Sequence, residues 1–229
     1  MTIPAIFLAS GFTLTGDTSL ETAQLVTADD RVRDYHSGHL PPNPDQLGGM
    51  FNFSDLAGKP VGDADFKGKW TLLYFGYARC TDSCPMAIPM IATAAKELRK
   101  SGIKTNAVFV DIEAPAVGYV RRRANKAAAP DGHVHLIDRD AALRSLQQSF
   151  GSELQILTGT RGQLSAATAA FRVAREHTPP RAGERGHSIN HSSLVYILDP
   201  RAKVAGYGYH TSTSEILIET VRRLKKAKS

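Results

Sequence analysis

The sequence predicts an α/β protein with a central mixed sheet flanked by helices. The run 70–75 is almost wholly apolar, as in a central strand that is covered on both faces. A helical pattern and a second apolar run, 107–111, follow it, and strand–helix–strand is the order of a parallel connection. An apolar share of 42% and a charged share of 22% are those of a globular chain with a sizeable core.

The other elements follow in chain order. Residues 50–56 alternate between apolar and polar, as a half-buried strand does. Pro85 can begin a helix, Pro89 predicts a kink or a delayed start, and 91–99 has the helical pattern. Later segments with strand or helix patterns are 141–150 (helix), 154–157 (strand), 165–175 (helix), 193–198 (strand) and 204–207 (strand of a hairpin). Ser212 with Glu215 predicts a capping box for a last amphipathic helix. This order is that of a thioredoxin-like sheet with additions.

Two regions are expected. Residues 1–45 are polar, end in a Pro-rich stretch and are predicted to be an N-terminal extension, a targeting segment or a linker. Residues 46–229 are predicted to form the folded domain. The apolar stretch 4–12 is short and no Lys or Arg precedes it, so it meets the criteria neither of a signal peptide nor of a spanning helix.

The chain is basic, with a net charge of +6. Much of the charge lies in the runs 121–123 and 222–228, which we expect to be solvated. The alternative is contact with an anionic membrane surface or an acidic partner. Nucleic-acid binding has no supporting motif, because aromatic residues do not alternate with the basic runs.

Cys80 and Cys84 are the only two cysteines, and they follow the strand at 70–75 directly. A spacing of four residues is about one helical turn, so both sulfur atoms can lie on one side. The pair can then close a disulfide, chelate one soft metal ion, or remain as two inert buried thiols. The start of a helix at Pro85 and the nearby Arg79 are expected to lower the pKa of Cys84.

Soft sulfur ligands favour copper(I), zinc and iron–sulfur clusters, and the last two usually need four protein ligands. Two cysteines and one histidine suit three-coordinate Cu(I), or Cu(II) with an added oxygen ligand. His191 precedes the strand at 193–198 and is the predicted third ligand, with His187 as the second choice. Met86 and Met90 are spaced as a core stripe rather than as thioether ligands. The histidines at 36, 39, 133 and 135 carry no such signal.

Several segments together resemble the Sco/SenC proteins of cytochrome c oxidase assembly. They are Gly48-Gly49 with Phe51, the stretch 68–77, Cys80-x-Asp82-x-Cys84-Pro85, the stretches 157–160 and 171–173, and the stretch 191–200. The resemblance covers roughly residues 48–225. It implies a thioredoxin fold that binds copper through Cys80, Cys84 and His191. It further implies a protein that passes copper to the binuclear copper site of the oxidase, or reduces the thiols of that site.

The chain departs from the family pattern at three places. Thr81 stands where the family commonly has Pro, and Asn190 where it commonly has Asp before the histidine. The loss of that Asp is expected to modulate copper affinity rather than abolish it. The family's acidic segment corresponds either to 111–115 or to 138–140, with an insertion over 112–137 that contains the Arg121–Arg123 run.

The main alternative function is a thiol–disulfide oxidoreductase, in which one cysteine attacks a partner disulfide and the other resolves it. A peroxidase is less well supported, since Tyr77 stands three residues before Cys80, where a Thr or Ser is wanted. A purely structural disulfide is the remaining reading. Both leading functions predict a periplasmic location. The protein is expected to be free in the periplasm, to face the periplasm at the inner membrane, or to lie in the equivalent intermembrane space.

Overall fold

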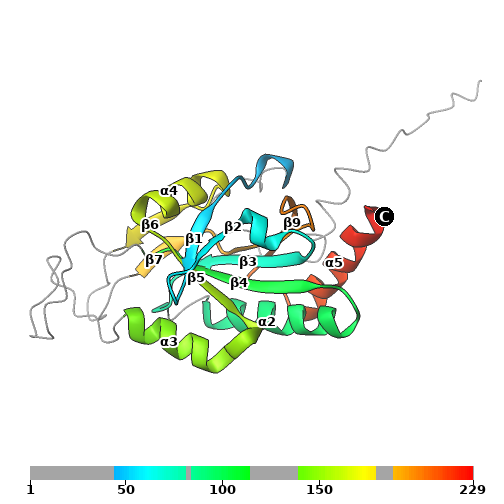
Figure 1. The fold of residues 1–229 in the computed structure, drawn as a ribbon, viewed down its shortest axis with the longest axis horizontal. Helices are drawn as coiled ribbons and strands as arrows, with labels where there is room; N and C mark the ends of the chain where they lie inside the picture. Colours follow the sequence, from blue (N-terminus) through cyan, green and yellow to red (C-terminus); the bar gives the residue numbers. More distant parts are fainter. Residues whose placement is uncertain (1–43, 81–83, 114–138, 179–187, 229) are drawn as a thin grey trace, which may run out of the picture.

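The computed structural model describes residues 44–80, 84–113, 139–178 and 188–228. They form a mixed α/β fold with one layer of sheet between two layers of helices (Figure 1). The strands are β1 (Asn52–Asp55), β2 (Pro60–Gly62), β3 (Trp70–Gly76), β4 (Thr105–Asp111), β5 (Gln155–Thr158), β6 (Arg175–Thr178), β7 (Ser188–His191), β8 (Leu194–Leu198) and β9 (Val204–Tyr209). The helices are α2 (Cys84–Lys100), α3 (Arg139–Phe150), α4 (Arg161–Ala170) and α5 (Ser214–Ala227), with short 3₁₀ turns η1 (Pro44–Gln46), η2 (Asp63–Phe66) and η3 (Gly151–Glu153).

The main sheet has seven strands in the order β2-β1-β5-β4-β3-β8-β9. β3, β4 and β5 are parallel, while β1, β2, β8 and β9 pair antiparallel with their neighbours. This confirms the predicted mixed sheet and the parallel connection from β3 through α2 to β4. The central strand β3 is buried along its whole length, as its apolar sequence predicts.

Alternate residues of the central strands enter two separate cores. Trp70, Leu72 and Tyr74 of β3 face α2, α3 and α5, whereas Leu73 and Phe75 face α4 and the β1–β2 hairpin. Figure 1 shows α2, α3 and α5 on one side of the sheet and α4 on the other. The fold is thioredoxin-like, as the element order predicts.

Three boundaries differ from those predicted. Helix α2 starts at Cys84 and runs through Pro89, so Pro89 neither delays nor ends it. Helix α4 occupies 161–170 rather than 165–175, and Arg175 lies in β6 instead. The last helix is capped by Thr213, whose side chain accepts a hydrogen bond from Ile216 N–H, while Ser212 Oγ accepts one from Tyr209 N–H.

The hairpin β6–β7 was not predicted. Its antiparallel register pairs Arg175 with His191, and it forms a second, two-stranded sheet. His191 is therefore the last residue of a strand, and β8 begins three residues later. The hairpin brings this histidine to the end of the main sheet where β3 and β4 finish.

Candidate functional site

The two cysteines lie beyond the carboxyl end of β3. The strand ends at Gly76, and the chain then turns, with Cys80 N–H donating to Tyr77 O at 3.0 Å. Cys84 is the first residue of α2. A strand that ends in a tight turn before a helix thus brings both sulfur atoms to one edge of the sheet, as the sequence predicts.

Both cysteines are free thiols in the structure. The Cys84 side chain is 2% exposed, while Cys80 is half-buried. A side-chain hydrogen bond to Cys80 raises the pKa of the Cys84 thiol strongly, and burial raises it further. The expected lowering of this pKa is therefore wrong. Arg79, one of the two features expected to lower it, forms an ion pair with Glu113. Cys84 therefore keeps its proton at neutral pH.

Tyr74 packs against Cys84 from the interior of the protein. This fully buried residue places its hydroxyl 3.9 Å from Cys84 Sγ. Gly76 is required for the same close packing, since a Cβ there would lie 2.7 Å from Cys84 Sγ and 2.9 Å from the Phe109 ring. Sequence reasoning missed Tyr74, although the alternation along β3 places it on the α2 face together with Trp70.

His191 is held against two aromatic rings at the same end of the sheet. Its ring meets Tyr74 edge-on at 6.0 Å between centroids, and Tyr77 at 6.1 Å. The residue is 8% exposed, and its Nδ1 lies 3.1 Å from Ser192 O. A carbonyl oxygen can only accept, so this bond requires a proton on Nδ1. That tautomer leaves Nε2 as the nitrogen that can bind a metal ion.

The structure brings the two sulfur atoms together and places His191 one aromatic ring away from Cys84. Over the described residues, no three or more His, Cys, Asp and Glu side chains gather closely enough to hold a metal ion. The available ligands, two soft thiols and one imidazole, nevertheless fit copper. Met90 is buried in the core as predicted, whereas Met86 is exposed. His187 and the histidines at 36, 39, 133 and 135 lie outside the described residues.

The end of β4 anchors the cysteine turn. Asp111 is fully buried; it accepts hydrogen bonds from Ala78 N–H at 3.3 Å and from Glu113 N–H at 3.4 Å. Its other carboxylate oxygen pairs with Arg139 Nε of α3 at 2.6 Å. Burial raises the pKa of Asp111 to about 6, while Arg139 opposes the shift.

The two acidic stretches that the sequence offered as alternatives, 111–115 and 138–140, thus meet in space through Asp111 and Arg139. Sequence reasoning treated them as competing choices. The pairing spans 28 positions along the chain, and no local pattern marks it. Glu113 adds a second anchor through its ion pair with Arg79, the residue directly before Cys80.

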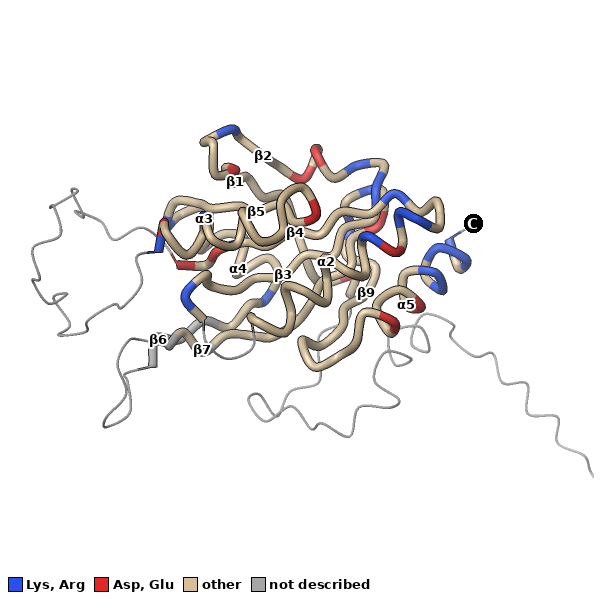
Figure 2. Tube along the Cα trace, turned by 90° about the horizontal axis from the view of Figure 1, so that it is seen from below, with Lys and Arg blue, Asp and Glu red and all other residues tan. Residues whose placement is uncertain are grey.

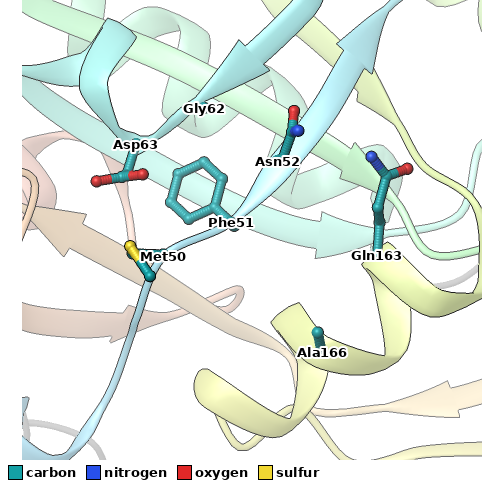
Figure 3. Close-up of a pocket in the computed structure, with 7 residues that line it drawn as sticks. All are labelled: Met50, Phe51, Asn52, Gly62, Asp63, Gln163 and Ala166. Atoms are coloured by element: carbon teal, nitrogen blue, oxygen red, sulfur yellow. The ribbon is translucent and has the colours of Figure 1, made fainter.

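A pocket elsewhere on the molecule contains none of these residues. It lies between the β1–β2 hairpin and α4 (Figure 3) and is lined by Met50, Phe51, Asn52, Gly62, Asp63, Gln163 and Ala166. Asp63 is the one ionisable residue among them, so this pocket offers neither a nucleophile nor a set of metal ligands.

A protein-family model and individual relatives both match this chain. The family model described as SCO1/SenC matches residues 40–115 and 137–226. The interruption at 116–136 falls within the predicted insertion over 112–137. The match includes both cysteines, His191, Asp111 and Arg139.

Individual relatives agree with the family model. The chain is 26% identical over 177 residues to the mouse protein named "Protein SCO2 homolog, mitochondrial". This alignment covers 76% of the present chain and 61% of the mouse protein. The chain thus spans less than two thirds of that relative. Among solved structures, Arabidopsis thaliana ScoI with copper bound has a TM-score of 0.63 at 21% identity and covers 79% of this chain and 99% of its own. Bradyrhizobium japonicum ScoI with copper bound has a TM-score of 0.58 at 25% identity, covering 79% and 98%.

No helix in the part of the chain that the structure describes combines the length and the apolar character that crossing a bilayer requires.

Proposed function

Because the chain belongs to the SCO1/SenC family, we propose that it is a copper metallochaperone whose cargo is held by Cys80, Cys84 and His191. In this proposal the protein delivers copper to the binuclear copper site of cytochrome c oxidase, or reduces the thiols of that site. Residues 46–229 form the copper-binding domain, and residues 1–45 are an extension of it. The recipient is the copper-receiving subunit of the oxidase or another thiol-bearing copper protein.

The observation that carries the proposal is the hydrogen-bonded pair of free thiols at the sheet edge. Two sulfur atoms in mutual contact can bind one soft ion after they lose their protons. Copper is bound in related structures, including one at 25% identity. A structural disulfide is less consistent with this arrangement, because both cysteines are free thiols.

The surrounding residues have separate tasks in copper binding. Tyr74 and Tyr77 orient the imidazole, and Ser192 O keeps the proton on Nδ1 so that Nε2 can bind. The remaining movement needed is the approach of His191 to the two sulfur atoms. In this proposal His191 binds copper last and is released first. Its release leaves a coordination position on the ion that a recipient thiol can occupy.

Transfer to a recipient tests the proposal. Full-length protein loaded with one Cu(I) is mixed with the reduced, metal-free copper-binding domain of an oxidase subunit, and copper is measured in each after separation. We expect copper to move from the wild type, and we expect the Cys80→Ser variant to carry too little copper to transfer. Retention of copper by the wild type in the presence of excess recipient would contradict the chaperone function.

A second candidate, a thiol–disulfide oxidoreductase, is favoured by one observation. Cys80 is half-exposed while Cys84 is buried, as in a pair in which the exposed thiol attacks and the buried one resolves. Cys80 as a thiolate would form a mixed disulfide with the partner. Cys84 would then displace the second partner sulfur, leaving a Cys80–Cys84 disulfide and a reduced partner.

Reduction of a small disulfide-bonded substrate separates the two functions. For an oxidoreductase, Cys84→Ser should trap the mixed disulfide and His191→Ala should leave turnover unchanged. For the chaperone, His191→Ala should impair copper transfer. Either function requires a compartment in which dithiol and disulfide interconvert, so we propose a location in the periplasm or the equivalent intermembrane space.

A further inference from the structure

The end of the sheet opposite the cysteines is strongly basic. Four segments meet there, namely 67–69, 96–104, 199–203 and 222–228. They contain thirteen of the 28 Lys and Arg residues of the chain but two of the 22 Asp and Glu residues. In the remainder of the chain acidic residues outnumber basic ones, although the net charge of the whole is +6. Figure 2 shows Lys and Arg gathered at this end, beside the C-terminus.

Backbone and side-chain bonds join the four segments into one surface. Gly68 N–H donates to Pro200 O at 2.8 Å, and Trp70 N–H donates to Lys104 O at 2.9 Å. Lys228 Nζ at the end of α5 donates to Asp199 at 2.7 Å. All thirteen basic residues are exposed, and we call them the basic pole: Lys67, Lys69, Lys96, Arg99, Lys100, Lys104, Arg201, Lys203, Arg222, Arg223, Lys225, Lys226 and Lys228.

The composition of the basic pole indicates what it binds. Nine of its residues are Lys and four are Arg. The large apolar side chains that are exposed in the described part of the chain, Met50, Leu56, Met86 and Ile216, all lie outside its segments. Protein interfaces are depleted in Lys and have an apolar centre, and single-stranded nucleic acid is bound with aromatic stacking. Lys side chains, as flexible point charges, instead suit a diffuse anionic surface.

We propose that the basic pole docks on the surface of an anionic lipid bilayer and that the cysteine edge then points away from it. β3 runs from Trp70 at the pole to Gly76 at the cysteine edge, and its seven residues span roughly 20 Å. This distance exceeds the Debye length of about 8–10 Å at physiological salt. The docked protein therefore keeps its thiols accessible to a partner. The proposal goes beyond copper handling and depends on no metal.

Sedimentation with vesicles tests the docking. The full-length, metal-free protein is mixed with vesicles of phosphatidylcholine alone or with about one third phosphatidylglycerol, at low salt and at about 0.3 M salt. We expect binding to the anionic vesicles alone, and we expect it to weaken at the higher salt. The variant Lys67→Gln/Lys69→Gln/Lys104→Gln/Lys226→Gln removes four pole charges that no described ion pair uses. It should bind about 100- to 1,000-fold more weakly.

The matched control removes four exposed charges in described segments outside the pole, as Lys59→Gln/Arg144→Gln/Arg161→Gln/Arg172→Gln. It has the same net charge as the pole variant and should bind within about threefold of the wild type. Thermal unfolding of both variants checks that each is folded. The proposal would be overturned if both variants lost binding to anionic vesicles equally. It would also be overturned if the wild type bound neutral and anionic vesicles equally well. Binding to poly-glutamate without binding to anionic vesicles would assign the pole to an acidic protein and overturn the lipid assignment.

The orientation has its own readout. Reaction of the cysteines with a thiol reagent should proceed at the same rate with and without anionic vesicles, because the cysteine edge faces away from them. Protection of the thiols on docking would show the opposite orientation and contradict this part of the proposal.

Discussion

At the scale of single residues, the chemistry of the cysteine edge depends on the proton that the two sulfur atoms share. The hydrogen bond to Cys80 and the burial of Cys84 both favour the protonated Cys84 thiol. Copper binds thiolates, so the ion must displace that proton. The resting thiol pair is therefore protected from unwanted reaction, and binding becomes sensitive to pH.

We predict that binding of Cu(I) at pH 8 releases at least one proton per copper ion. The apparent affinity should rise about tenfold per pH unit for each displaced proton. An indicator in weakly buffered solution measures the release, with Cys84→Ser as the control that should release fewer protons. Copper binding without proton release would mean that Cys84 is already a thiolate.

We predict that Gly76→Ala destabilises the fold and disturbs Cys84, because the new methyl group would lie 2.7 Å from Cys84 Sγ. The expected loss in the free energy of unfolding is about 1–3 kcal/mol. Gly162→Ala is the matched control. A methyl group at Gly162 would meet no atom within 4 Å beyond the adjoining backbone, and this variant in α4 should change stability by at most about 1 kcal/mol, in the favourable direction. Chemical denaturation measures both, and equal stability of the two variants would contradict the close packing at Gly76.

The sequence was sufficient to select Cys80, Cys84 and His191 as candidates, because soft ligands at the edge of an apolar strand are recognisable from residue type and order. It could not reveal that Arg79 is occupied by Glu113, since the two residues are 34 positions apart. It assigned the wrong direction to the pKa of Cys84 because it did not foresee the hydrogen bond to Cys80 and the burial of Cys84, which both raise that pKa.

At the scale of elements, the apolar strands and their order were predictable and the helix ends were not. Helix α4 ends in a motif in which Val173 N–H donates to Thr168 O and Arg172 N–H donates to Ala169 O. The residue in the left-handed region is Arg172, with φ of 52°, so the usual glycine signal is missing. The start of α4 does carry a sequence signal, the capping box of Thr160 and Gln163, but the predicted start at 165 overlooked it.

The end of β4 and the start of α3 together hold the cysteine turn, and this arrangement has a pH signature. The folded-state pKa of Asp111 is about 6, above the ordinary value of 3.8. The folded protein therefore binds this proton more tightly than the unfolded chain does. The contribution of the Asp111 proton to the free energy of unfolding is full below about pH 4 and is lost as pH rises to about 6.

We predict that Asp111→Asn removes this pH dependence. Across the window from about pH 4 to about 6, the wild type should lose roughly 3 kcal/mol of unfolding free energy relative to the variant. Asp140→Asn is the control, because Asp140 lies on the same helix as Arg139 and its side chain is 68% exposed. Denaturation at a series of pH values gives the comparison. Parallel curves for the wild type and Asp111→Asn would contradict the burial of an ionisable Asp111.

At the scale of the whole molecule, the basic pole and the cysteine edge occupy opposite ends of one sheet (Figure 1). The element order was enough to predict the thioredoxin-like arrangement, since parallel connections restrict how strands can be ordered. The β6–β7 hairpin was not predictable from residue patterns, because its strands are short and polar. The boundary between extension and domain stays a prediction.

We predict that the chain shortened to 44–229 is as stable as the full chain, whereas the chain shortened to 46–229 loses about 1 kcal/mol. Pro44 is buried, and its carbonyl accepts a hydrogen bond from Leu47 N–H at 3.0 Å. Thermal and chemical unfolding of the three chains measure the difference. A loss of several kcal/mol in both shortened chains would place the first residues within the cooperative fold.

The central claim is that one copper ion is held by Cys80, Cys84 and His191. Anaerobic titration of the reduced full-length protein with Cu(I), against a competing chelator, tests it most directly. We predict one tightly bound ion per chain, and a loss of about a hundredfold or more in affinity in His191→Ala, since changes to residues that merely support a ligand cost about 10- to 100-fold. His187→Ala should bind as the wild type does. Equal affinity in the wild type and His191→Ala would contradict the three-ligand site.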